Sequence, residues 1–273
     1  MPVKIPLEDN FADVLAKAQR GLGLSDEELA TRSGVSPVAL EKIQAGAALE
    51  PELKKIASIL GLGPLSLLAL AQSRYQPADI PEIPGLALFT SAFHEMTVNA
   101  FLIWDPETKE AALFDTGADG QPVLDFVEKR GLDLKQIFIT HRHTDHIFDL
   151  DRLLEKTGAQ AWVSELEPLE GAEPFPPGSI FQIGQLGVET RQTSGHAKGG
   201  VTYIIRGLHE PVAVVGDSIF AGSMGGGMVS YTEALRNNRE RVLTLPDSTI
   251  ICPGHGPLTT VGEQKQSNPF FAE

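Results

Sequence analysis

The chain has 273 residues, a formal net charge of −14 and a hydrophobic fraction of 42%. This length suits one large domain and a small one, and the acidic balance argues against nucleic-acid binding by the chain as a whole. The single cysteine, Cys252, excludes an internal disulfide. Neither a signal peptide nor an apolar run of membrane-spanning length is evident. We therefore expect a cytoplasmic protein that does not contact the membrane.

The N-terminal stretch is predicted to be helical. Apolar residues recur at helical spacing between Phe11 and Ala18. The segment from Ser25 to Glu28 has the pattern of a capping box, in which each end residue can bond the backbone of the other. Ser36, directly before a proline, is typical of the start of a further helix. These signals predict a compact bundle of short helices.

This bundle resembles the helix-turn-helix domain of the Cro and phage-repressor family. The matching stretches are residues 29–30, 33–36, 40–43 and 56–61. In such domains the third helix enters the major groove of DNA. The first 75 residues carry eight Lys or Arg and nine Asp or Glu, however, so no excess of positive charge favours phosphate binding. We therefore favour a role for this domain in forming a homodimer or another protein contact over a role in binding DNA.

The chain is predicted to divide at a proline-rich linker. Residues 76–84 lack an apolar pattern and read as extended. The linker separates the helix-turn-helix domain, residues 1–75, from a larger domain, residues 85–273. In the larger domain strand and helix patterns alternate, which is typical of the α/β class.

The predicted elements of the larger domain follow in chain order. They are a hairpin at 97–104 and 110–114, a helix closed by Gly131, a strand at 136–140, a helix at 148–156, a strand at 161–163, an acidic surface loop at 165–178, strands at 187–192, 201–205 and 211–215, a helix at 232–242 and a strand at 249–252.

The strand at 136–140 leads directly into a run of ligand-type residues. His141 and His143 alternate, so on an extended chain they project to the same side. Asp145 and His146 can reach the same place only if the chain turns before them. Imidazole and carboxylate are the ligands that Zn, Mn and Fe(II) prefer. The sequence therefore predicts a metal site at the end of this strand.

Three further candidates follow later strands in glycine-rich turns. They are His196, Asp217 and His255, each with a glycine beside it that permits a close backbone approach. Five of the seven histidines fall in these motifs. We expect the other two, His94 and His209, to be ordinary surface or packing residues.

Together the motifs resemble those of the metallo-β-lactamase superfamily. The resemblance covers residues 85–273 and implies an αββα sandwich with its site at one edge. It implies seven ligands for two divalent ions: His141, His143 and His196 for the first, Asp145, His146 and His255 for the second, and Asp217 for both. It also implies that Asp115, which begins an Asp-Thr-Gly motif, supports this loop from outside the ligand set.

Such a site is suited to hydrolysis. A water molecule between two cations is acidified enough to form hydroxide at neutral pH. We expect Asp145 to orient the hydroxide and to accept its proton. Zinc is the favoured metal, and iron or manganese accepts the same ligands. Because no serine elbow or catalytic cysteine is evident, we predict a metallohydrolase.

The segments around Asp217 and His255 resemble the glyoxalase II-like branch, that is, the hydroxyacylglutathione hydrolase-like enzymes, which hydrolyse thioesters. Residues 224–229 depart from that branch, since its basic and aromatic glutathione-binding residues are not evident there. We also expect no counterpart of the branch's helical extension with further basic residues. The glutathione part of the substrate is therefore in doubt. Lys198, close to His196, is a weak candidate for attracting an anionic substrate.

Three alternatives stay open. A persulfide dioxygenase resembles this branch but uses a single iron, held by the counterparts of His141, His196 and Asp217. A lactonase or another ester hydrolase could use the same site. A transcriptional regulator would combine a metal domain that senses a ligand with DNA-binding helices.

Overall fold

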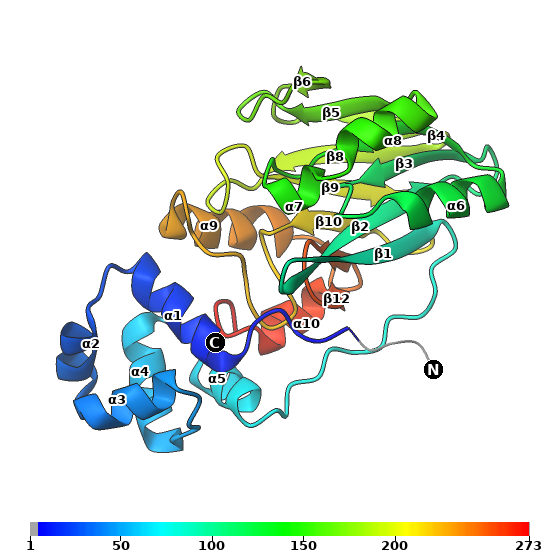
Figure 1. The fold of residues 1–273 in the computed structure, drawn as a ribbon. Helices are drawn as coiled ribbons and strands as arrows, with labels where there is room; N and C mark the ends of the chain where they lie inside the picture. The colour runs from blue at the N-terminus through cyan, green and yellow to red at the C-terminus, as the bar shows by residue number, and fades with distance from the viewer. Residues whose placement is uncertain (1–4, 273) are drawn as a thin grey trace.

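The computed structural model describes residues 5–272, in which a helical part precedes two packed β-sheets (Figure 1). The helical part contains α1 (Phe11–Gly21), α2 (Asp26–Ser33), α3 (Pro37–Gln44), α4 (Glu50–Leu60) and α5 (Pro64–Ala71). The predicted capping box begins α2, because the backbone nitrogens of Ser25 and Glu28 each donate to the other side chain, at 2.8 and 3.2 Å. No helix within the described residues is long and apolar enough to cross a membrane.

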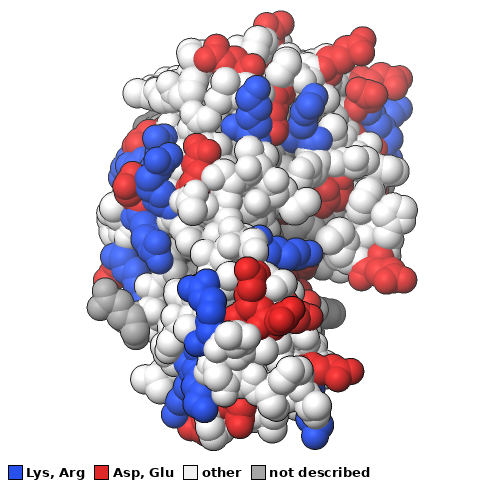
Figure 2. All heavy atoms as spheres, turned by 90° about the vertical axis from the view of Figure 1, so that its left-hand side faces the viewer, with Lys and Arg blue, Asp and Glu red and all other residues white. Residues whose placement is uncertain are grey.

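Helices α2 and α3 meet at the predicted tight turn, where Gly34 adopts a φ of 64°. The side chain of Gln44, on α3, is engaged within the helical part, since its Nε2 donates to Asp26 at 2.9 Å. Figure 2 shows one face of the molecule. Basic side chains lie along one side of that face, with acidic side chains beside them and across the middle. The face drawn there is therefore not uniformly basic. The helix-turn-helix identity, DNA binding and dimerisation stay predictions.

The chain after the helical part is built on two six-stranded sheets. The first has the strand order β1 (Leu86–Phe93), β2 (Met96–Trp104), β3 (Glu110–Phe114), β4 (Asp133–Phe138), β5 (Gln160–Ser164) and β6 (Ala172–Phe175). The second has the order β12 (Thr259–Thr260), β11 (Ile250–Pro253), β10 (Val212–Gly216), β9 (Val201–Arg206), β8 (Leu186–Gln192) and β7 (Ile180–Ile183). Both sheets are mixed: β3 pairs antiparallel with β2 and parallel with β4, and β10 pairs antiparallel with β9 and parallel with β11.

Alternating side chains hold the first sheet between two apolar layers. On β2, Phe101 and Ile103 pack between the sheets with residues of β9, whereas Leu102 faces the other side. That other side is covered by α6 (Gln121–Arg130) and α8 (Leu150–Thr157). Because successive side chains on a strand point to opposite faces, each strand contributes to both layers.

The outer face of the second sheet is covered in the same way. Ala213 and Val215 of β10 pack with Val242 and Val261. These belong to the segments formed by α9 (Tyr231–Asn237), the π-helix η1 (Asn238–Val242) and α10 (Val261–Ser267). The order helix, sheet, sheet, helix confirms the predicted αββα sandwich preceded by helices.

Some element boundaries differ from the sequence-based predictions. The strand predicted at 136–140 ends at Phe138 and begins earlier. The loop predicted at 165–178 includes β6, which is hidden in the sequence because Pro174 interrupts the pattern. This proline is tolerated since β6 lies at the edge of the sheet. The helix predicted at 232–242 divides into α9 and η1, and β1, β7 and α10 have no predicted counterpart.

The helical part shares an apolar core with the sandwich. Buried residues of α1–α5 form one cluster with Met224, Tyr231, Ala234 and Phe270. The approach is close, because a Cβ added to Gly21 would lie 2.2 Å from the Tyr231 ring. Residues 76–84, the predicted linker, contain neither helix nor strand. The domain boundary there stays a prediction, and a shared core connects the two sides of it.

We predict that Gly21→Ala destabilises the protein by about 1–3 kcal/mol, because the added methyl group forces the Tyr231 ring out of a packed interface. Urea unfolding monitored by circular dichroism measures the effect. Gly187→Ala is the matched control, since a Cβ at Gly187 meets nothing within 4 Å. An equal, small effect of both substitutions would contradict the close packing of α1 on α9.

Candidate metal centre

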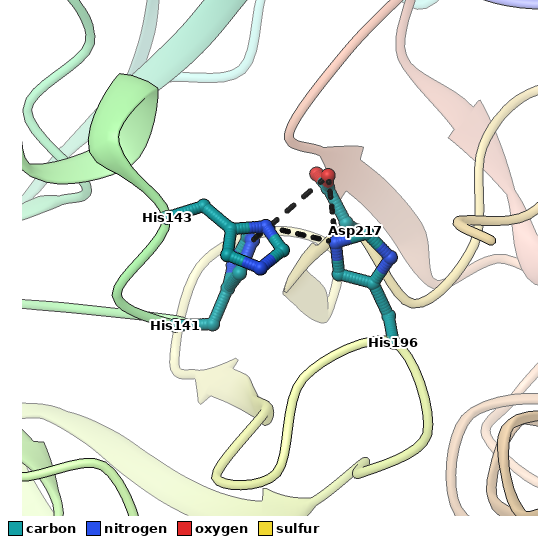
Figure 3. A group of neighbouring side chains, drawn as sticks. All are labelled: His141, His143, His196 and Asp217. Carbon is teal, nitrogen blue, oxygen red and sulfur yellow. Dashed lines mark hydrogen bonds and ion pairs between the residues drawn. The ribbon is translucent and has the colours of Figure 1, made fainter. Parts of the chain in front are cut away.

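Four ligand-type side chains gather at one edge of the sandwich (Figure 3). They are His141, His143, His196 and Asp217, and their donor atoms lie within 4.8 Å of one another. Nδ1 of His143 lies 3.0 Å from Nε2 of His141 and 3.1 Å from Nε2 of His196. Oδ2 of Asp217 lies 3.4 Å from Nε2 of His196. The structure therefore brings together the four residues predicted to surround the first ion.

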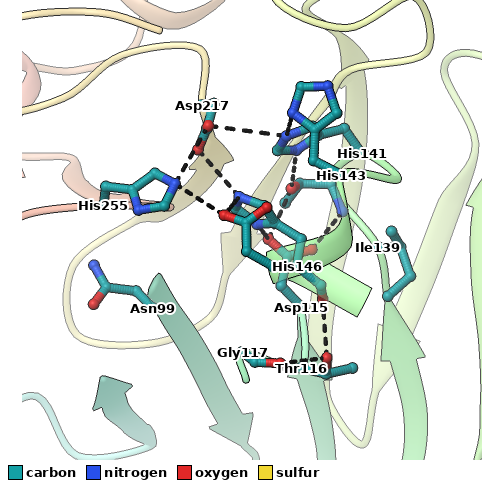
Figure 4. A network of polar contacts seen from close by, with 12 residues as sticks. Asn99, Asp115, Thr116, Gly117, Ile139, His141, His143, His146, Asp217 and His255 are labelled. Atoms are coloured by element: carbon teal, nitrogen blue, oxygen red, sulfur yellow. Dashed lines mark hydrogen bonds and ion pairs between the residues drawn. The ribbon is translucent and has the colours of Figure 1, made fainter. Parts of the chain in front are cut away.

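A second group lies on the other side of Asp217 (Figure 4). Asp145 and His146 lie on the short helix α7 (Thr144–Ile147), so the chain makes the turn that the sequence required. Nε2 of His255 lies 3.3 Å from Oδ2 of Asp145 and 3.5 Å from Oδ2 of Asp217. Oδ1 of Asp217 lies 3.3 Å from Nε2 of His146. One carboxylate is thus shared by both groups.

In four of the imidazole rings Nε2 faces the centre. The other ring nitrogen, Nδ1, is the outer nitrogen, and its hydrogen bond orients the ring. The Nδ1 atoms donate outward: His141 to Oγ1 of Thr140 at 3.1 Å, His146 to Oδ2 of Asp115 at 2.8 Å, His196 to the carbonyl of Gly226 at 2.9 Å, and His255 to the carbonyl of Thr97 at 2.6 Å. A neutral ring with a proton on Nδ1 keeps its lone pair on Nε2. The four Nε2 atoms therefore face the centre, where each can offer a lone pair to a metal ion once its ring is neutral, as in metal sites where the second nitrogen donates to a carboxylate or carbonyl.

Asp115 connects separate segments of this edge. It follows β3, and its carboxylate accepts from the backbone nitrogen and the hydroxyl of Thr140, both at 2.7 Å, and from His146. The residue is buried and has a φ of 57°. A left-handed conformation is uncommon outside glycine and occurs where the surroundings constrain a functional site. These contacts suit the supporting role expected from the sequence.

The donor atoms fit divalent metal ions. Ligands about 2.0–2.2 Å from a tetrahedral zinc ion lie about 3.3–3.6 Å apart, close to the separations in both groups. Two buried atoms, Nε2 of His146 and Oδ1 of Asp217, have no hydrogen-bond partner among the described residues. An ion between them would satisfy both. Gly254 keeps this space open, because an added Cβ would lie 2.3 Å from Oδ1 of Asp217.

Protonation in the first group favours metal binding. Burial lowers the pKa of His141 well below its usual value and also lowers the pKa of His196. Burial opposes ionisation of Asp217, but the adjacent His146 and His255 hold the pKa of this carboxyl well below its usual value. Two rings are therefore neutral and the shared carboxyl is ionised at neutral pH.

The second group holds protons more tightly. Burial disfavours the charged form of His146, but Asp115 and Asp217 outweigh it and raise the pKa of this ring to about 10. Burial likewise opposes the charge on His255, whose pKa hydrogen bonds to Asp145 and Asp217 raise to about 11. In the metal-free protein both rings are therefore protonated at neutral pH.

The other residues singled out in the sequence lie outside these groups. Lys198 is exposed on the turn after His196, and its role with an anionic substrate stays a prediction. His94 and His209 are exposed. Cys252 is buried between the sheets, and burial raises the pKa of its thiol.

Sequence reasoning missed two residues that shape the centre. Asn99 donates to the carbonyls of Pro253 at 3.0 Å and Gly256 at 2.8 Å, on either side of His255. It stands inside an otherwise apolar strand, and this buried amide is the signal that could have identified it. Thr140, whose hydroxyl donates to Asp115 and accepts from His141, ends the strand predicted at 136–140 but has no ligand chemistry of its own.

Four exposed apolar side chains and the half-buried ring of Phe93 border the same edge. We define the apolar rim as Phe93, Met96, Phe148, Met228 and Val229. The Phe148 ring, directly after α7, lies 5.6 Å from the Phe93 ring at the tip of the β1–β2 hairpin. Met96, at the same tip, is exposed, and so are Met228 and Val229 in the glycine-rich loop before α9. Met96 is next to Thr97, whose carbonyl bonds His255, and Met228 is two residues from Gly226, whose carbonyl bonds His196, so the rim lies in segments that contact the proposed ligands.

Comparison with known proteins identifies the family. The sequence model described as "Metallo-beta-lactamase superfamily" matches residues 95–255, more than half of the chain. The chain belongs to the metallo-β-lactamase superfamily. This range contains all seven residues of the two groups, whereas α1–α5 lie outside it.

Curated relatives in the superfamily include hydrolases. The chain is 31% identical over 199 residues to hydroxyacylglutathione hydrolase GloC of Haemophilus influenzae, covering 63% of this chain and 92% of that one. It is 30% identical over 197 residues to the probable metallo-hydrolase YqgX of Bacillus subtilis, covering 63% and 90%. The similarity supports a metallohydrolase.

Solved structures give the same fold. The BLEG-1 B3 metallo-beta-lactamase superposes with a TM-score of 0.61 at 26% identity, covering 68% of this chain and all of that one. ETHE1 from Myxococcus xanthus superposes with a TM-score of 0.58 at 25% identity, covering 67% of this chain and 83% of that one. The two-sheet sandwich is therefore the superfamily's fold.

We predict that the two groups differ in how metal binding depends on pH. An ion at the second group must displace protons from His146 and His255, so its affinity should rise by up to about 100-fold per pH unit below their raised pKa values. The affinity for the ion at the first group should change less with pH, since His141 and His196 are already neutral. Chelator competition between pH 6.5 and 8.5 measures both affinities. Equal slopes for the two ions would contradict the assignment.

Proposed function

We propose that the protein is a hydrolase with two divalent metal ions that cleaves a thioester or an ester. The observation that carries the proposal is the carboxylate of Asp217, which is shared by two groups of inward-facing donors. Its Oδ2 lies 3.4 Å from Nε2 of His196 and its Oδ1 lies 3.3 Å from Nε2 of His146. A carboxylate shared by two groups of donors can hold two neighbouring ions close enough to act on one substrate.

Each residue has a distinct role in this proposal. The ligands are His141, His143 and His196 for one ion, Asp145, His146 and His255 for the other, and Asp217 for both. Asp115 fixes the ring of His146 and the strand end at Thr140, which keeps the donors in place. Zinc is the first choice for both positions, and iron or manganese accepts the same donors.

The chemistry follows from these positions. Two divalent ions would polarise the substrate carbonyl and acidify a water molecule for attack. Asp145 would orient the water and accept a proton. In the metal-free protein burial opposes ionisation of this carboxyl, but a hydrogen bond from His255 lowers its pKa. No covalent nucleophile is required, and the Cys252 thiol is buried in the core.

The substrate class is inferred from two observations. A curated relative is a hydroxyacylglutathione hydrolase, which supports a thioester. The apolar rim supports an acyl or leaving group with an apolar portion, because such a group would cover exposed side chains such as Phe148 and Met228. Residues 224–229 supply no basic side chain for a glutathione carboxylate.

We predict that His143→Ala lowers the metal content and abolishes hydrolysis of S-lactoylglutathione and of a model thioester. The reason is that Nδ1 of His143 lies between the Nε2 atoms of two other proposed ligands. Metal content by mass spectrometry and thioester cleavage by absorbance measure the effect.

His209→Ala is the matched control, since the side chain of His209 is 85% exposed and distant from the proposed ligands in the fold. It should retain both ions and full activity. Unchanged metal content and turnover in His143→Ala would overturn the proposed function. A panel of lactones and of glutathione persulfide with dissolved oxygen, run on protein of known metal content, separates a lactonase or a persulfide dioxygenase from a thioesterase.

A further inference from the structure

One loop touches both proposed ligand groups. We define the metal loop as residues 217–230, which connect β10 to α9 and begin with the shared carboxylate. The ring of Phe220 packs edge-on against the ring of His255, with centroids 5.7 Å apart. Farther along, the carbonyl of Gly226 accepts the outer hydrogen bond of His196. The position of this loop therefore affects ligands of both ions.

The helical part holds the middle of the metal loop. The hydroxyl of Ser223 donates to the carboxylate of Asp9, which precedes α1. Met224 is buried in the apolar core of the helical part. Gly222 lies so close to Tyr75 that an added Cβ would be 2.7 Å from the Tyr75 ring. The loop is thus fixed by contacts from α1–α5 and from the segments that flank them.

Lys17, on α1, extends these contacts toward the metal centre. Its Nζ forms an ion pair with Asp9, donates to the carbonyl of Met224 at 2.9 Å, and lies 5.1 Å from the centre of the Phe220 ring. The side chains of Lys17 and Asp9 are only 14% and 8% exposed. Water and salt therefore screen the pair weakly, and a desolvated cation attracts an aromatic ring more strongly.

Membership of the superfamily does not account for this connection. The matched range is residues 95–255, and both Lys17 and Asp9 lie outside it. The same contacts also explain why a helical part and a sandwich share one core, since the buried pair lies where the two meet. Removing one partner from such a pair leaves an uncompensated buried charge.

We propose that Lys17 and Asp9 are positioning residues for the metal centre. They hold the metal loop, and through Phe220 the ring of His255, in the geometry that receives the ions. The helical part therefore contributes to metal affinity without contributing a ligand. This inference rests on the proposed function only in that two ions bind, and it does not depend on which substrate is cleaved.

The test is the double variant Lys17→Met/Asp9→Leu in the full chain. Replacing a buried ion pair with apolar residues of similar size often leaves stability unchanged, so the variant separates positioning from folding. We expect the ion at Asp145, His146 and His255 to bind roughly 10-fold more weakly, as when outer contacts of metal ligands are lost. Chelator competition with Zn(II) measures both affinities, and the visible spectrum of the Co(II)-loaded protein should change.

Two further variants and one further measurement make the result specific. Lys54→Met/Glu50→Leu removes an exposed ion pair of the same helical part, whose side chains are 43% and 47% exposed, and should leave both affinities unchanged. Lys17→Arg keeps a cation near Phe220 and should retain most of the wild-type affinity for the second ion. Urea unfolding of the metal-free proteins gives the stability of each variant.

Weaker binding of the second ion with unchanged metal-free stability supports the proposal. Wild-type affinities in the double variant would overturn it, and so would a loss of affinity matched by an equal loss of unfolding free energy. The outcome is separate from that of the proposed function. If the wild-type protein binds two ions but cleaves no thioester or ester, the substrate assignment fails and the positioning role is still decided.

Discussion

Nitrogen and oxygen lone pairs that face one small buried space repel one another unless a cation lies between them. This constraint underlies the whole edge of the sandwich. The rings cannot turn away, because their outer nitrogens are bonded to Thr140, to Asp115 and to the carbonyls of Thr97 and Gly226. The inward-facing donors therefore need positive charge among them: in the metal-free protein the protons on His146 and His255 supply it, and bound metal ions would take their place.

The fold supplies this constraint by bringing distant segments to one edge. His141 and His143 follow β4, Asp217 follows β10, and His255 follows β11, so both sheets contribute. Buried apolar side chains on both faces fix these strands, which leaves the side chains after the strand ends as the groups free to carry chemistry. The shared carboxylate joins the contributions of the two sheets.

Much of this could be predicted from the sequence, and the limits have physical reasons. Residues His141 to His146 combine a strand with ligand chemistry at short range, and the alternation of elements predicts the α/β class. The αββα arrangement was predicted only through the resemblance of the motifs to a known family. The contacts of Asn99 and Lys17 could not be predicted, because they join residues more than a hundred positions apart and have no local pattern. β6 was missed for a related reason: it depends on pairing with β5, since its own sequence is interrupted by a proline.

Anomalous X-ray diffraction from crystals of the zinc-loaded protein tests the central claim most directly. The account predicts two ions about 3.5–4 Å apart, one among His141, His143 and His196, the other among Asp145, His146 and His255, with Asp217 touching both. A single ion, or ions bound elsewhere while these side chains keep their positions, would contradict it.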